Sequence, residues 1–476
     1  MKPSWPKRGH GEDKPRSLFV VYDNESHIHE IPLGIAYLVA VMEAHGYKAD
    51  IYHQDINHYP EAHLREFLDK EKYDFLGLSF IGGYWQFKKA VAIAAAVNAS
   101  RNRPFFALGG HGPSPEPGYF LKKMQADAIC IGEGEETILD LLEALANGRN
   151  LSAVPGIACR DGHDVRVNER RPLIKDLEAL PFPAYHRFPM EVYRLLPMAH
   201  SSKTDFVGRM ISGRGCPFQC NFCYRMDTGF RPRSNESIIE EIRLLNKDFG
   251  INYIAFVDEL LMVSEQRVVL LCEDFMRAGF KFKWVCNGRL NYAKPNVLKL
   301  MKRSGCVFIN YGIECMDDAI LKTMRKQLTV EQIIKGIEVT LAEGISPGFN
   351  VIFGNIGENR RTLSAGVEFL LRYDDGSQRR TVRPVTPYPG SELYYKAIEM
   401  GLLKDCADFY ENKHVNSDLL TVNFTELSDD DFYQALMEAN KKLLENYNRR
   451  LQSNMERDLQ NLYVNKDAGF RGFRST

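Results

Sequence analysis

The sequence predicts an α/β protein made of two successive α/β units and a helical C-terminal region. Three observations predict this class. Short apolar runs alternate with helical stretches over residues 17–149, a second alternation begins at residue 207, and the sequence after residue 395 is helical and polar. Strands that alternate with helices favour right-handed βαβ units around a parallel sheet. The chain of 476 residues is long enough for two or three domains of roughly 100–200 residues.

The first unit, residues 17–149, contains five strand–helix repeats. Its strands are predicted at 17–23, 48–55, 73–80, 104–110 and 126–136, and its helices at 33–46, 61–72, 85–100, 117–125 and 137–148. Five repeats make a complete doubly wound, Rossmann-like domain. Ligands of such sheets bind at the carboxyl ends of the strands, and these ends carry small and polar residues here.

Residues 150–205 differ from their neighbours and are interpreted as a connector with a small hairpin and a Pro-rich segment. The second unit, residues 206–395, contains about six β/α repeats. Its strands are predicted at 208–213, 253–259, 282–289, 307–314, 347–354 and 379–390. Two further repeats would be needed for a closed barrel, so a partial (β/α)6 barrel is expected. Residues 396–476 are expected to form a helical cap and tail, and residues 1–16 a flexible leader.

Composition excludes several classes of partner. The chain has 61 basic and 62 acidic residues, so its formal net charge is −1 and no nucleic-acid partner is expected. No apolar run approaches the ~20 residues that span a bilayer, and the N-terminus lacks the apolar core of a secretory signal. Ten cysteines without a secretory signal fit a reducing compartment, which predicts a cytoplasmic location.

Three cysteines lie close together in the stretch RGCPFQCNFC, at Cys216, Cys220 and Cys223. A structural zinc site would need four ligands, usually two CxxC-type pairs, and no second pair exists. A disulfide is disfavoured because the compartment is reducing and the number of clustered thiols is odd. Three thiolates on a four-iron cluster would leave one iron open to a substrate or cofactor. We therefore favour an iron–sulfur cluster with an open iron over a zinc site or a disulfide.

This motif, CxxxCxxC with the aromatic Phe222 before its last cysteine, follows the first strand of a predicted α/β barrel. In that position it resembles the motif of the radical S-adenosylmethionine (SAM) superfamily. The resemblance implies a [4Fe–4S] cluster on the three cysteines, SAM on the open iron, and cleavage of a carbon–sulfur bond by one electron. It also implies an external one-electron reductant such as flavodoxin or ferredoxin.

Other strand ends extend the resemblance. The implied SAM contacts, besides Phe222, are Asp258 and Glu259 in FVDEL, Arg289 in WVCNGRL, and Glu314 in NYGIECMDD. The stretch TPYPGSELY (386–394) matches the last barrel strand of one subgroup. The sequence departs from the family pattern where Cys315 replaces a usual serine, and where Asn355 and Ile356 stand in the loop that shapes the adenosine site.

The unit 17–149 resembles the cobalamin-binding domain that precedes the barrel in one radical SAM subgroup. That subgroup includes anaerobic Mg-protoporphyrin IX monomethyl ester cyclase and the carbon and phosphorus methylases. The implied cobalamin contacts are Ser79, Gly109, Gly110, Gly132, Glu133 and Gly134. Glycines let the backbone approach a large flat ring closely.

The DxHxxG motif, which supplies a cobalt ligand in other cobalamin proteins, is absent from the sequence. His27, His29, His53 and His58 lack its spacing and are interpreted as surface or loop residues. Cobalamin would then be held without a histidine ligand. The alternative is a domain that keeps the fold without the cofactor.

The resulting hypothesis is a radical SAM enzyme that methylates an unactivated carbon or phosphorus centre of a small metabolite with cobalamin. The first alternative is oxidative cyclisation, or transfer of another SAM fragment such as the 3-amino-3-carboxypropyl group with the N-terminal domain as a scaffold. The second is a non-catalytic metal-binding module. No catalytic acid or base is identified, and Phe409 and Tyr410 in the cap are expected to pack rather than to bind a ligand.

Overall fold

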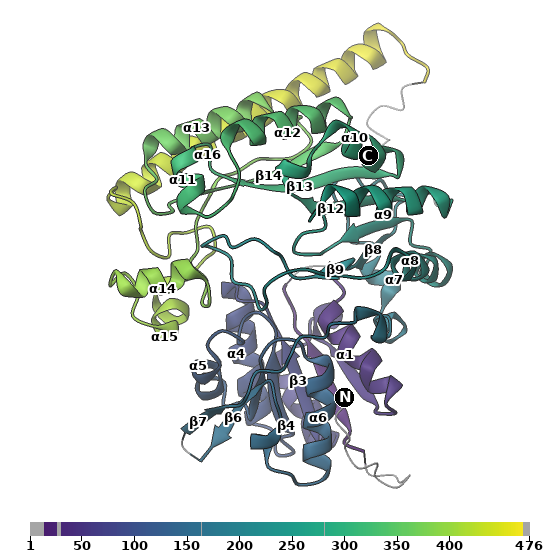
Figure 1. Ribbon diagram of the computed structural model, residues 1–476, viewed down its shortest axis with the longest axis vertical. Coiled ribbons are helices and arrows are strands. Elements are labelled where there is room, and N and C mark those ends of the chain that lie inside the picture. The colour runs from purple at the N-terminus through teal and green to yellow at the C-terminus, as the bar shows by residue number, and fades with distance from the viewer. Residues whose placement is uncertain (1–13, 26–29, 163, 280, 470–476) are drawn as a thin grey trace.

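Two mainly parallel sheets follow one another along the long axis of the molecule, and helices cover both of them (Figure 1). This computed structural model describes residues 14–25, 30–162, 164–279 and 281–469. The expected leader, apart from residues 14–16, lies outside the described residues, and so do His27 and His29.

The N-terminal sheet has the order β2-β1-β3-β4-β5-β6-β7 within the described residues, and its first five strands are parallel. Its strands are β1 (Ser17–Val21), β2 (Ala49–His53), β3 (Phe75–Ser79), β4 (Phe105–Gly109), β5 (Ala128–Cys130), β6 (Ile157–Asp161) and β7 (Asp164–Val167). Its helices are α1 (Leu33–Ala44), α2 (Gln54–Asn57), α3 (Glu61–Lys70), α4 (Tyr84–Asn98), α5 (Pro117–Lys123) and α6 (Glu135–Ala146). The predicted doubly wound domain is confirmed.

Every residue of β1 is buried, and alternate residues enter two separate cores. Phe19 and Val21 pack on the face covered by α1 and α6, whereas Leu18 and Val20 pack on the face covered by α3, α4 and α5. A strand buried on both faces has to be apolar throughout, and for this reason SLFVV shows no polar alternation.

The hairpin predicted in the connector is β6 and β7, and it continues the N-terminal sheet. β6 pairs antiparallel to β5, and β7 pairs antiparallel to β6. The rest of the connector carries short helical turns: η1 (Leu151–Ala153), η2 (Leu177–Ala179), η3 (Tyr185–Arg187) and α7 (Met190–Tyr193). Tyr193 donates a hydrogen bond to Asp55 at 2.6 Å, and Tyr185 donates one to Glu241 at 2.6 Å. The connector is therefore bonded to both units.

The second sheet is an open half-barrel of six parallel strands in the described part of the chain, in the order β15-β14-β13-β12-β11-β8. The strands are β8 (Val207–Met210), β11 (Tyr253–Phe256), β12 (Lys283–Gly288), β13 (Cys306–Glu314), β14 (Ser346–Phe353) and β15 (Arg383–Pro384). The helices are α8 (Asn235–Phe249), α9 (Glu265–Arg277), α10 (Pro295–Arg303), α11 (Asp318–Thr323), α12 (Val330–Ala342) and α13 (Arg360–Arg372), with the turn η4 (Leu290–Tyr292). The predicted partial barrel is confirmed.

The C-terminal region packs on both sheets. Its elements are α14 (Glu392–Glu399), α15 (Cys406–Asp408), the π-helical turn η5 (Phe409–Lys413), α16 (Asp429–Leu459) and the π-helical turn η6 (Gln460–Val464). Tyr410 stacks on Phe87 of α4, with ring centroids 4.6 Å apart, and Phe432 of α16 stacks on Phe353 of β14 at 4.7 Å. The packing role expected for Phe409 and Tyr410 is confirmed, because both are buried.

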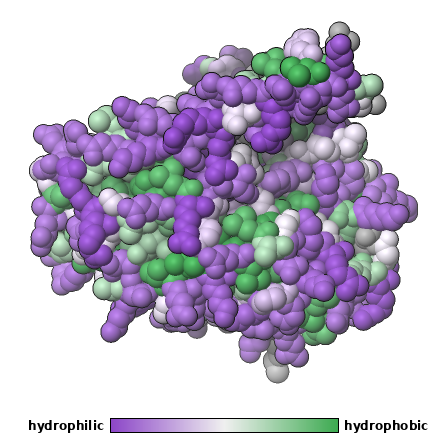
Figure 2. All heavy atoms as spheres, turned by 90° about the horizontal axis from the view of Figure 1, so that it is seen from above, coloured by the Kyte–Doolittle hydropathy of each residue, from purple (hydrophilic) through white to green (hydrophobic). Residues whose placement is uncertain are grey.

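The longest helix, α16, is polar over most of its length. Its N-cap Ser428 accepts a hydrogen bond from the Asp431 amide, and three aspartates in its first turn complement the helix dipole. None of the described helices is long and apolar enough to cross a bilayer. Seen from above, this face of the molecule is mainly hydrophilic, and its hydrophobic residues form small separate groups (Figure 2).

Candidate active site between the two sheets

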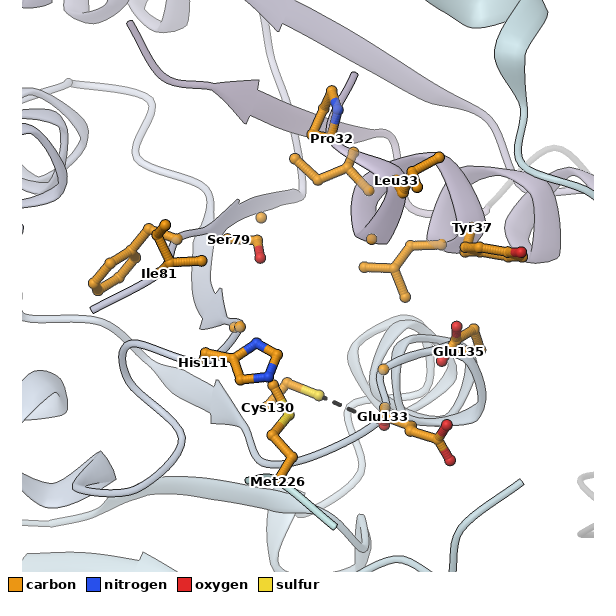
Figure 3. A pocket seen from close by; sticks show the side chains of 18 of the residues that line it. Pro32, Leu33, Tyr37, Ser79, Ile81, His111, Cys130, Glu133, Glu135 and Met226 are labelled. Carbon is orange, nitrogen blue, oxygen red and sulfur yellow. Dashed lines mark hydrogen bonds between the residues drawn. The ribbon is translucent and has the colours of Figure 1, made fainter. Parts of the chain in front are cut away.

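A cavity of about 870 Å³ lies between the carboxyl ends of the N-terminal strands and the loops of the half-barrel (Figure 3). All six residues expected to contact cobalamin line it: Ser79, Gly109, Gly110, Gly132, Glu133 and Gly134. β1 and β3 are neighbours in the sheet, but the helices that follow them, α1 and α4, pack on opposite faces of it. Such switch points are the usual ligand sites of doubly wound sheets.

Two glycines shape the rim of this cavity. A Cβ atom at Gly110, where φ is +93°, would lie 2.6 Å from the carbonyl oxygen of Phe80, so no larger residue fits. A Cβ atom at Gly132, where φ is +86°, would meet no atom within 4 Å and would stand in open space. The backbone can therefore lie directly against a ligand at this rim.

An inner slot extends from the rim between the sheet and helices α1 and α6. Phe19, Gly77 and Ala107 form its sheet side, and Leu38 and Leu141 form its helix side. A wide rim and a deep apolar slot together fit a flat macrocycle that carries a long appended group. Cobalamin has this form, so the residues present fit the expected cofactor.

His53 and His58 are not among the residues that line the cavity. His53 lies beside Asp55 and packs edge-on against Phe188, and His58 pairs with Asp23 at 2.9 Å. Among the cavity residues that the structure describes, the histidine is His111, from the loop after β4. Its Nε2 atom lies 3.8 Å from Oε1 of Glu259, and its ring lies 6.1 Å from that of Tyr224. His111 was not predicted from the sequence, although it directly follows Gly109 and Gly110.

The three cysteines lie on a loop whose two ends form a short antiparallel pair, β9 (Gly213–Arg214) and β10 (Arg231–Pro232). Burial raises the pKa of Cys216 and of Cys223, the latter to about 12, and the nearby Cys220 adds to both shifts. In the described part of the chain, no three Cys, His, Asp or Glu side chains are gathered as ligands of a single ion. A four-iron cluster is wider than one ion, so its ligands need not converge so closely.

Asn221, between the second and third cysteines, holds this loop against the half-barrel. Its side-chain amide pairs reciprocally with that of Asn355, at 3.3 and 3.1 Å, and its backbone amide donates to the carbonyl of Met324 at 3.0 Å. Asn355, which departs from the family pattern, is fully buried. This departure therefore has a structural reason, since the side chain fixes the cysteine loop.

Arg289 lies against the cysteine loop from the end of β12. Its guanidinium lies 3.5 Å from the centroid of the Phe218 ring and donates to the carbonyl of Gln327 at 3.1 Å. Burial lowers the pKa of Arg289, and the thiols of Cys220 and Cys216 oppose that shift. Its Nε atom is buried without a hydrogen-bond partner among the described residues. An unpaired cationic donor beside the cysteines fits the carboxylate of a bound SAM.

Glu314 ends β13 in the left-handed region, with φ at +68°. This conformation is strained for a residue with a side chain, and such strain is concentrated at functional sites. The Glu314 carboxylate pairs with buried Lys326 at 2.8 Å, and the Lys326 ammonium lies 5.9 Å from the centroid of the Phe222 ring. Phe222, Glu314 and Lys326 thus form one wall beside the third cysteine.

The two acidic residues after β11 differ in their surroundings. Asp258 is buried and accepts hydrogen bonds from the backbone amide and hydroxyl of Ser212 at 2.8–3.0 Å. Burial raises the pKa of Asp258, and the Ser212 bonds oppose that shift. Glu259 is partly exposed toward His111. Of the two side chains, Glu259 is the one free to meet a ligand.

Two families match the chain. The Radical SAM superfamily matches residues 210–370, which include the cysteine loop and most of the half-barrel. The B12 binding domain matches residues 22–142, which include the strand ends around the cavity.

Relatives span most of the chain. An uncharacterized methyltransferase of Pyrococcus horikoshii is 29% identical over 380 residues, which cover 78% of this chain and 79% of that protein. Anaerobic magnesium-protoporphyrin IX monomethyl ester cyclase of Rubrivivax gelatinosus is 27% identical over 390 residues, covering 79% and 68% respectively. The structure of the radical S-adenosylmethionine methyltransferase TsrM from Kitasatospora setae, with cobalamin and a [4Fe–4S] cluster bound, covers 90% of this chain and 89% of its own. Its TM-score is 0.71 at 14% identity, which shows a shared fold.

Proposed function

We propose that this chain, which belongs to the radical SAM superfamily and carries a B12-binding domain ahead of its half-barrel, is a cobalamin-dependent methyltransferase. Its substrate is a small molecule with an unactivated carbon or phosphorus centre. The observation that carries the proposal is the cavity between the two sheets, because residues from both family matches line it. Cys216, Cys220 and Cys223 are not among its lining residues, but Gly215, which precedes Cys216, is, so both cofactors would lie close to one substrate.

The chain's own residues bind and orient the cofactors. Cys216, Cys220 and Cys223 hold the [4Fe–4S] cluster, and Arg289, whose guanidinium lies against the cysteine loop, takes the SAM carboxylate. When bound, the cluster and SAM supply a one-electron cleavage of a carbon–sulfur bond, and cobalamin supplies a methyl carrier.

The remaining residues arrange the site. Glu259 meets the SAM amino group, and Phe222 and Glu314 line the neighbouring wall. Ser79, whose hydroxyl has no hydrogen-bond partner among the described residues, binds the appended group of cobalamin. Gly109, Gly110, Gly132 and Gly134 let the backbone approach the corrin ring.

Anaerobic reconstitution tests the proposal. The protein is loaded with iron and sulfide, then mixed with SAM and a one-electron reductant, with or without hydroxocobalamin. We expect 5′-deoxyadenosine in both mixtures, and S-adenosylhomocysteine only in the mixture with cobalamin. The Cys216→Ala variant should lose 5′-deoxyadenosine. The Cys315→Ala variant is its matched control, because Cys315 is a buried thiol outside the cysteine loop.

Two outcomes would contradict the proposal. One is S-adenosylhomocysteine formation that does not depend on bound cobalamin. The other is 5′-methylthioadenosine as the main nucleoside, which would mean that the 3-amino-3-carboxypropyl group had moved instead of the methyl group.

A further inference from the structure

Two arginines mark the ends of the cysteine loop. Arg214 ends β9, Arg231 begins β10, and the two residues are direct partners in the antiparallel pair. All three cysteines lie between them in the sequence. Both side chains are mostly buried, with 16% and 17% of their surface exposed. A group that binds both arginines therefore closes the loop at its base.

Glu133, from the B12-binding domain, is that group. Its Oε1 atom lies 2.7 Å from Nη1 of Arg214 and 3.0 Å from Nη1 of Arg231, and its Oε2 atom lies 2.9 Å from the same Arg231 nitrogen. The backbone amide of Ile174 donates to Oε2 at 2.8 Å. Four contacts satisfy a carboxylate, so Glu133 has little capacity left for a ligand in the cavity.

Glu133 together with Arg214 and Arg231 is called the clamp, and the charges of the side chains around it balance. Arg214 also binds Glu135 at 2.5 Å. Arg231 lies 3.8 Å from Asp227, which pairs with Arg170 at 2.8 Å, so three arginines face three carboxylates. Burial alone would raise the pKa of Glu133, but the Arg214 hydrogen bond and the two positive charges lower it overall. Loss of one partner from such a buried set leaves an uncompensated charge, which costs far more than loss of a surface ion pair.

The position of Glu133 links the clamp to the cavity. Gly132 and Gly134, its neighbours in sequence, both line the cavity. The guanidinium of Arg214 also lies 5.1 Å from the ring of Tyr37, another cavity residue. A ligand that orders the turn after β5 therefore orders the carboxylate that holds the cysteine loop.

We propose that Glu133 is a positioning residue that couples cobalamin binding to the order of the cysteine loop. The proposal rests on the proposed function for the identity of the ligand. Because such coupling is reciprocal, a formed cluster tightens cobalamin binding as much as cobalamin steadies the cluster loop.

The test uses the full chain with hydroxocobalamin as the probe. Its dissociation constant is measured before and after anaerobic cluster reconstitution, in the wild type and in Glu133→Gln. Hydrogen exchange of residues 213–232 is measured in the same proteins without cobalamin. Glu136→Gln is the matched control, because Glu136 lies on the first turn of α6 but binds Arg171, at 3.3 Å, instead of the loop.

In the wild type, the cluster should tighten hydroxocobalamin binding by about tenfold, within the usual range of coupling between sites. Glu133→Gln should reduce this factor to less than about twofold and speed exchange of residues 213–232 by about tenfold. Glu136→Gln should behave as the wild type. If Glu133→Gln does not fold, the same measurements are made on Arg231→Gln. This variant removes two of the four contacts to the Glu133 carboxylate and leaves Arg214 in place.

Two results would overturn the proposal. One is unchanged exchange of residues 213–232 in Glu133→Gln. The other is an equal loss of hydroxocobalamin affinity with and without the cluster, which would make Glu133 a direct ligand contact. If hydroxocobalamin bound in neither state, cobalamin dependence would be refuted, and the exchange data alone would decide the clamp.

Discussion

Replacement of Asn355 by alanine tests whether the half-barrel holds the cysteine loop through one amide pair. The variant removes both hydrogen bonds between Asn355 and Asn221, and also the bond that the backbone amide of Ile356 donates to Oδ1 of Asn355 at 2.8 Å. The Asn221 Nδ2 group keeps the carbonyl of Thr323 at 3.3 Å, but its Oδ1 atom loses its partner in a buried site. One orphaned acceptor and one lost net hydrogen bond together cost about 3 kcal/mol.

Two measurements follow this change. For a half-barrel of this size, the loss lowers the midpoint of thermal unfolding by about 6–12 °C. Anaerobic reconstitution should also leave less iron per chain, because the middle of the cysteine loop is no longer held. The control is Asn350→Ala on β14, the strand that precedes Asn355, where an exposed amide donates to Asn310 at 3.0 Å. Its effect should stay within about 0.5 kcal/mol.

Equal midpoints and equal iron contents in Asn355→Ala and Asn350→Ala would show that the amide pair does not hold the cysteine loop. A lower midpoint with iron bound and retained as in the wild type would also contradict this role, because the amide pair would then support the barrel without positioning the loop.

Three further changes test other parts of the site. Arg289→Gln should weaken SAM binding by about 10–100-fold in equilibrium dialysis, the value of one charge-assisted hydrogen bond, while iron content stays constant; an unchanged dissociation constant would contradict the assignment. Glu358 lies in the loop after β14, is buried, and accepts hydrogen bonds from the backbone amides of Gly354 and Asn355 at 2.8 and 2.9 Å. Burial raises the pKa of Glu358 to about 7. Because this folded-state value lies above the unfolded one, its stabilisation is complete at low pH and is lost as the pH rises through about 7. Glu358→Gln should remove roughly 3 kcal/mol of that pH dependence in denaturant titrations, and equal slopes in both proteins would refute it. Ala107→Leu fills the inner slot and should abolish retention of hydroxocobalamin on gel filtration, whereas Ser79→Ala, at the rim, should only weaken it; full retention by Ala107→Leu would exclude the slot as the binding site.

The strands and helices could be predicted because their signals are local. The apolar run 18–21 of β1 and the glycine after α1 act within a few residues, and both were interpreted correctly. The hairpin β6–β7 was also predicted, but not its place in the sheet. The partner of β6 is selected by geometry that develops only when the sheet forms, so no local pattern encodes its antiparallel pairing to β5.

The candidate site shows the same division. The spacing of the cysteines predicted one loop, whereas the partners of that loop are remote: Glu133 lies 81 residues from Arg214, and Asn221 lies 134 residues from Asn355. Asp258 and Glu259 share one motif, yet only the packing of Ser212 distinguishes the buried carboxylate from the partly exposed one. His111 carried a usable signal, since it follows two glycines at a strand end where ligands of doubly wound sheets bind.

The cap formed by α14, α15 and η5 has a consequence for the integrity of the whole chain. Tyr410 and Phe409 share one hydrophobic core with Phe87 and Phe120 of the N-terminal domain, although about 300 residues separate them in sequence. The N-terminal domain is thus completed by a segment that lies about 300 residues later in the chain. The N-terminal domain is therefore not a detachable module. Until the cap has been made, the face of Phe87 that Tyr410 covers is exposed to water.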